Sequence, residues 1–116
     1  MSVAFNGFKE SLATFLAASG FTAAGVPVKI SANDTVDACA AGDSFCGVAS
    51  QVSGGYATVQ MSGFATLGYT GATAPSAGYN LLAGDGSGGV KVVTTGGRSM
   101  LIVRVDTTAK TAGVML

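Results

Sequence analysis

The longest regular pattern of hydrophobic and polar positions runs from residue 57 to residue 70. Apolar side chains alternate there with threonine, glutamine and serine, and the apolar set is Ala57, Val59, Met61, Ala65, Leu67 and Tyr69. A period of two predicts a β-strand that buries one face. The alternation continues across Gly63, so we expect one long strand that is bent or interrupted at this glycine, where no side chain resists curvature.

Three shorter segments repeat this alternation, at residues 26–30, 90–92 and 101–106. The first should bury Val26, Val28 and Ile30, and the other two are half-buried strands whose apolar sets are Val90 and Val92, then Leu101, Val103 and Val105. An apolar end at residues 112–116 can close the sheet. Six to eight short strands without a long helix predict an all-β fold, a small barrel or a sandwich.

Glycine-rich stretches separate these strands. The chain has 18 glycines and only two prolines, with runs of glycine at residues 84–89 and 96–97. Such runs predict flexible hairpin tips, and Asn33-Asp34 supplies the side chains of a turn.

The N-terminal segment permits more than one structure. A helical stripe is formed by Phe8, Leu12, Phe15 and Leu16, yet residues 12–18 equally suit a strand, and Gly20 ends either element. A third interpretation is an arm that becomes ordered on a partner. We therefore divide the chain into residues 1–23, an N-terminal arm or short helix or strand, and residues 24–116, a β-barrel domain.

Charge is scarce and balanced. The 116 residues are 48% hydrophobic and 10% charged, whereas a self-sufficient domain usually has roughly 25–35% charged residues on its surface. We therefore expect part of the surface to face other protein subunits. Six basic residues balance six acidic ones, so there is no basic field for phosphates, and nucleic acid is not an expected partner.

The start of the chain lacks a basic region, and polar side chains interrupt the apolar residues from Phe8 to Ala18. Neither a signal peptide nor a membrane span is expected. Cys39 and Cys46 are the only cysteines, and we predict two free, partly buried thiols because no export signal accompanies them.

Phe64 breaks the alternation of its segment and points with the polar set. It is either an ordinary surface residue or an anchor of a protein interface, where aromatic residues are enriched. With Phe5, Phe8 and Phe15 of the N-terminal segment it makes up the predicted partner-binding set.

Candidate chemistry is sparse. The absence of histidine excludes Ser-His-Asp and Cys-His nucleophiles and histidine-containing zinc sites. Gly42-Asp43-Ser44 predicts a turn, and the glycines at 84, 86 and 89 predict a hairpin because a strand rather than a helix follows them. Asp34 and Asp37 are expected to be solvated turn aspartates. We predict no catalytic, cofactor-binding or metal-binding residue, and no enzyme activity.

The order of motifs over residues 24–116 resembles bacteriophage capsid decoration (cement) proteins. The segments that carry the resemblance are AGVPVK at 24–29, FCGVA at 45–49, ATVQMSG at 57–63, AGY at 77–79, DGSGGVKV at 85–92, VRVD at 103–106 and GVML at 113–116. Residues before Ala24 lie outside it.

This resemblance implies a β-barrel or β-tulip domain that is made in the bacterial host cytoplasm and attaches to the capsid exterior of the virion. The implied partners are the major capsid protein, whose lattice it would stabilise, and further copies of the chain in a homotrimer. An N-terminal arm would reach the lattice, and the family has no catalytic residues.

Two other classes of function remain open. A receptor- or glycan-binding β module of a phage tail or fibre is the alternative, although no tryptophan and only three tyrosines leave little for sugar stacking. An enzyme would have to build its active site from aspartate, lysine, tyrosine or cysteine alone.

Overall fold

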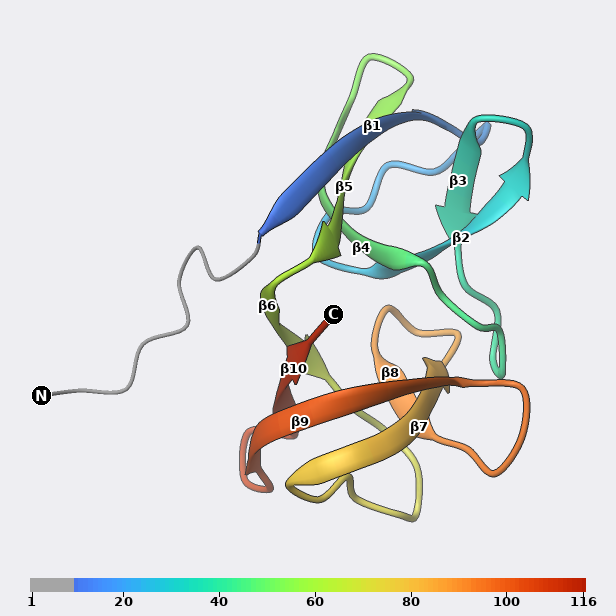
Figure 1. Ribbon diagram of the computed structural model, residues 1–116. Coiled ribbons are helices and arrows are strands. Elements are labelled where there is room, and N and C mark those ends of the chain that lie inside the picture. The colour runs from blue at the N-terminus through green and yellow to red at the C-terminus, as the bar shows by residue number, and fades with distance from the viewer. Residues whose placement is uncertain (1–9) are drawn as a thin grey trace, which may run out of the picture.

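The computed structural model describes residues 10–116, which form ten β-strands and no helix (Figure 1). The predicted all-β fold is confirmed. The first half forms a closed barrel in the order β1-β3-β2-β4-β5. Its strands are β1 (Ser11–Ala17), β2 (Pro27–Ala32), β3 (Thr35–Ala38), β4 (Gly47–Ser53) and β5 (Tyr56–Ser62).

The second half forms a five-stranded sheet in the order β6-β10-β9-β7-β8. Its strands are β6 (Phe64–Gly68), β7 (Gly78–Gly84), β8 (Val90–Val92), β9 (Arg98–Asp106) and β10 (Thr111–Met115). A bridge between Tyr69 and Val90 joins the two edges of this sheet, so it too curls around a core.

The N-terminal segment supplies a wall of the barrel. Residues 11–17 are a strand, antiparallel to β5 and parallel to β3. Leu12 and Leu16 point outward, whereas Phe15 packs against the barrel core. Two of the four residues of the helical stripe thus lie on the solvent side, because pairing with β5 satisfies the backbone groups of β1 that face it and imposes a period of two.

Gly63 interrupts the long alternating segment, as predicted. Its φ of 101° lies in the region that glycine adopts without steric cost. The interruption separates β5 in the barrel from β6 in the second sheet, so one sequence pattern serves two cores. The barrel core contains Phe21, Val28, Val36, Ala49, Ala57 and Val59, and the second core is built around Leu67, Tyr69, Leu82, Val90, Met100, Ile102, Ala112 and Val114.

The loop between β3 and β4 joins the two halves. Cys39 and Phe45 from this loop belong to the second core. Its backbone meets the end of β7 in two hydrogen bonds, from the Gly42 N–H to the Gly84 carbonyl and from the Gly84 N–H to the Asp43 carbonyl, both 2.9 Å. The loop therefore attaches the barrel to the second sheet (Figure 1).

Two expectations about buried faces were wrong. Ile30 is 53% exposed rather than buried, because β4 pairs with β2 only at Pro27 and Val28 and the β2–β3 hairpin extends past it. In β9 the buried residues are Met100 and Ile102 instead of the predicted alternating set. The β9–β10 register is irregular at Val103, which has no partner in β10. Beyond this residue the inward face of β9 changes parity, so Val105 packs against the core.

Candidate interaction surface

Three adjacent strands of the barrel carry no charged side chain. Aspartate, glutamate, lysine and arginine are absent from residues 11–28 and from residues 44–84. These intervals contain β1, β4 and β5, and the barrel topology places the three strands side by side in the order β4-β5-β1. We call this surface the neutral wall. Depletion of charge is a characteristic of the central part of protein interfaces.

Large apolar side chains project from the neutral wall. Leu12 is 54% exposed, Leu16 is 44% exposed and Tyr56 is 56% exposed. Leu16 and Tyr56 are direct cross-strand partners in the β1–β5 register, so their exposed surfaces adjoin. The remaining outward side chains are hydroxyls and amides, including Thr14, Ser50, Gln51, Ser53 and Thr58.

One edge of β1 is open. Strand β3 pairs with β1 only at Leu16 and Ala17. The Leu16 N–H donates to the main-chain carbonyl of Asp34 on the β3 side at 2.8 Å, whereas the Ala17 N–H donates to the carbonyl of Gly55 on the β5 side at 2.9 Å. Because successive residues of a strand alternate sides, the N–H and C=O groups of Leu12 and Thr14 point away from β5. No strand within residues 10–116 pairs with them.

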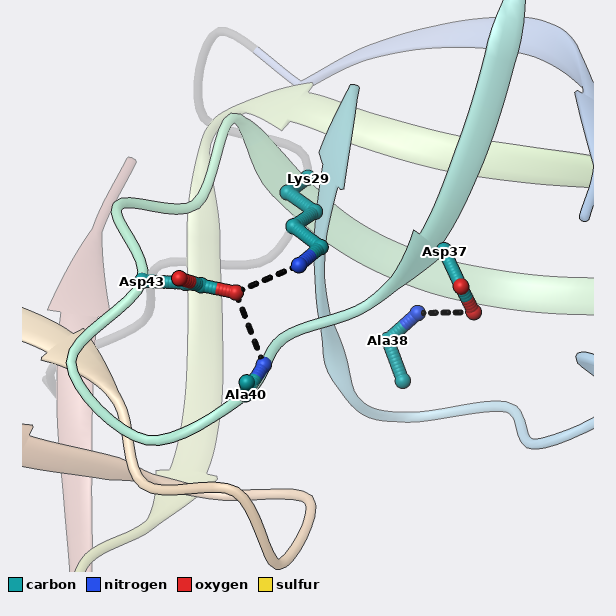
Figure 2. Close-up of polar contacts among 5 residues, drawn as sticks. All are labelled: Lys29, Asp37, Ala38, Ala40 and Asp43. Carbon is teal, nitrogen blue, oxygen red and sulfur yellow. Dashed lines mark hydrogen bonds and ion pairs between the residues drawn. The ribbon is translucent and has the colours of Figure 1, made fainter. Parts of the chain in front are cut away.

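The charged side chains lie elsewhere, and Asp43 forms an ion pair with Lys29 (Figure 2). Its carboxylate accepts hydrogen bonds from the Lys29 ammonium at 2.6 Å and from the Ala40 N–H at 2.9 Å. The hydrogen bond from Lys29 is the main cause that lowers the pKa of Asp43, and the hydrogen bond from Ala40 lowers it further. The hydrogen bond between Lys29 and Asp43 also raises the pKa of Lys29. The contact fastens the β3–β4 loop to β2.

The other two aspartates of this region act separately. Asp34 is exposed at the β2–β3 turn with a φ of 58°, as predicted for a turn aspartate. Asp37 lies within β3 rather than in a turn, and its carboxylate accepts the Ala38 N–H at 2.8 Å (Figure 2).

The glycine-rich stretch after β7 is a hairpin, as predicted. Asp85 organises it: one carboxylate oxygen accepts the N–H groups of Ser87 (2.6 Å) and Gly89 (3.0 Å), and the other accepts the Thr70 hydroxyl at 2.9 Å. Partial burial by itself would raise the pKa of Asp85, but these hydrogen bonds lower it below its ordinary value. The aspartate therefore has a structural role in the hairpin.

Both cysteine thiols are free, Cys39 buried and Cys46 half-buried, in agreement with the prediction. Burial raises the pKa of Cys39 to about 11 and also raises that of Cys46, so neither is a reactive thiolate at neutral pH. Cys39 also lines an apolar cavity of about 230 Å³ between residues 26–27 and the β7–β8 hairpin. Over residues 10–116 no group of three or more acidic or cysteine side chains is placed to bind a metal ion.

The predicted partner-binding phenylalanines occupy different environments. Phe5 and Phe8 lie outside the described residues. Phe15 points into the barrel, and Phe64 is half-buried, with the Arg104 guanidinium 5.5 Å from its ring centroid. The exposed set on the neutral wall was not identified from sequence. The long intervals without charge were the available signal, but they also include β6 and β7 of the second sheet, and β1, β4 and β5 form one surface only because β1 closes the barrel beside β5.

Comparison with protein-family models found no family that matches the chain, and comparison with curated proteins found no match. No helix among the described residues is long and apolar enough to cross a membrane.

Proposed function

We propose that this is a structural virion protein that binds the outer surface of a phage head and stabilises the lattice of the major capsid protein. The observation that carries the proposal is the neutral wall, a charge-free surface of three strands with exposed Leu12, Leu16 and Tyr56. Such a surface suits burial against protein more than exposure to water. The phage head as its location rests on the motif order described above.

The fold is suited to this role. Two connected β-structures, each with its own core, make up residues 10–116 without a helix. On a symmetric lattice the same modest contact is repeated many times, so the total stabilisation is large even when a single contact is weak. The resemblance also implies a homotrimer, and the solution mass of the chain decides between that state and the dimer inferred below.

Co-sedimentation with capsid shells of a candidate host phage, assembled without decoration protein, tests the proposal. We expect saturable binding, with a fixed number of copies per shell, and a higher temperature of shell disruption. Tyr56→Lys on the neutral wall should weaken binding, since it places an unpaired charge in the contact. Tyr79→Lys is the matched control, because Tyr79 is 75% exposed on β7 of the other sheet.

Absence of binding to shells and to the isolated capsid protein would contradict the proposal. If both lysine variants lost binding equally, the neutral wall would have no specific role in the contact with the capsid.

A further inference from the structure

We propose that the open edge of β1 pairs with β1 of a second copy of the chain, antiparallel and across a twofold axis, to form a dimer. This inference goes beyond the proposed function, because it concerns contact between copies in the absence of any capsid. It starts from backbone groups that no strand within residues 10–116 pairs: Leu12 and Thr14 each direct one N–H and one C=O away from β5. Open strand edges of this kind are templates for pairing with another strand.

The geometry of the edge selects a register. With Ala13 on the twofold axis, Leu12 of each copy lies opposite Thr14 of the other. All the outward N–H and C=O groups of these two residues then find partners across the axis. The edge can accept a strand here because β3 reaches only Leu16 and Ala17.

The self-complementary register argues for a second copy as the occupant, and the charge pattern permits it. A twofold contact brings the residues nearest the axis close to their own counterparts, so a charged side chain there would be repelled by its copy. Strand β1 has no charged residue, and neither does its neighbour β5. The outward side chain of Leu12, 54% exposed in the single chain, would be covered by Thr14 of the partner copy.

The contact is short, since the open part of β1 spans residues 11–15, which is about 17 Å of strand. Stable complexes bury roughly 1,200–2,000 Å², and one short strand pair covers less. We therefore expect a dimer that dissociates on dilution rather than a permanent one.

Light scattering on the full chain over a wide concentration range tests this pairing. We expect the mass to rise from 11.3 kDa toward twice that value. Leu12→Lys and Leu12→Glu should each raise the dissociation constant about tenfold or more, through repulsion across the axis. An equimolar mixture of the two variants should recover the dimer, because the charges are then opposite. Tyr79→Lys should dimerise like the wild type.

Thr14→Pro provides a second variant. The Thr14 N–H points away from β5, so proline removes an edge donor without removing a bond of the barrel, and it should also prevent dimerisation. Circular dichroism checks that each variant is folded.

A wild-type chain that stays monomeric at every concentration, or that forms a trimer, would overturn the inference. So would dimerisation that Leu12→Lys leaves unchanged, or a mixture of variants that stays monomeric. None of these outcomes depends on capsid binding, so failure here and failure of the proposed function are separate results.

Discussion

Gly84 is a sensitive point of the structure, because the β3–β4 loop approaches β7 there. A Cβ atom at this position would overlap the Cβ of Cys39, and the Cys39 sulfur would lie 3.3 Å away. Cys39 is buried, and the Gly84 backbone is held by two hydrogen bonds to the loop. Neither side can move away without breaking those bonds, so we expect Gly84→Ala to be strongly destabilising.

The expected magnitude follows from overpacking. Forcing an extra methyl group into a packed site costs about 1–3 kcal/mol. For a domain of this size 1 kcal/mol corresponds to roughly 4 °C in Tm, so the variant should melt about 4–12 °C below the wild type. Differential scanning calorimetry measures both the shift and whether the barrel and the second sheet still unfold together.

Gly68→Ala is the matched control. Gly68 also lies in a strand of the second sheet, but the nearest atom to an added Cβ is the Lys110 carbonyl oxygen at 3.9 Å, so we expect a change within about 1 kcal/mol. Cys39→Gly should partly rescue Gly84→Ala by removing the overlapping atom. If Gly84→Ala and Gly68→Ala had equal Tm values, the close packing of the loop on β7 would be refuted.

Three further predictions concern the polar groups and the thiols. Asp85→Ala should lower stability by about 1–2 kcal/mol at pH 7 by removing three hydrogen bonds. Folding lowers the pKa of Asp85, so the stabilisation by its carboxylate is complete above the ordinary aspartate pKa and is lost as the pH falls through the lower pKa of the folded state. The Tm values of the wild type and of Asp85→Ala, measured from pH 6 to pH 2, should therefore converge at low pH. Cys39, with a pKa of about 11, should react with Ellman's reagent at pH 7.5 far more slowly in the folded protein than in urea, and equal rates would contradict its burial. Lys29→Met keeps a stem of similar length and removes the charge, so it should lower Tm only slightly, and less so in 1 M NaCl, because the Lys29–Asp43 pair is solvent-accessible; a large loss of Tm that salt leaves unchanged would contradict this weak, screened contribution.

The neutral wall shows how sequence and structure contribute to a site. The two intervals without charge can be read from the sequence. That β1, β4 and β5 from these intervals form one surface depends on β1 closing the barrel between β5 and β3, a pairing between strands far apart in the chain. Phe64 is a second example. Its departure from the alternation is visible in the sequence, but its position beside Arg104 and over Gly113 comes from the pairing of β6 with β10.

The sequence by itself determined the all-β class, the break at Gly63, the hairpins at residues 33–34 and 84–89, and the free thiols. The first three follow from the period of two and the conformational freedom of glycine, and the free thiols were expected because no export signal accompanies the two cysteines. Only the tertiary structure decided that β5 and β6 belong to different sheets, that Ile30 is exposed and that Asp43 meets Lys29. Those outcomes depend on which backbone edges pair over long distances, and a periodicity of two specifies a face of a strand without specifying the strand beside it.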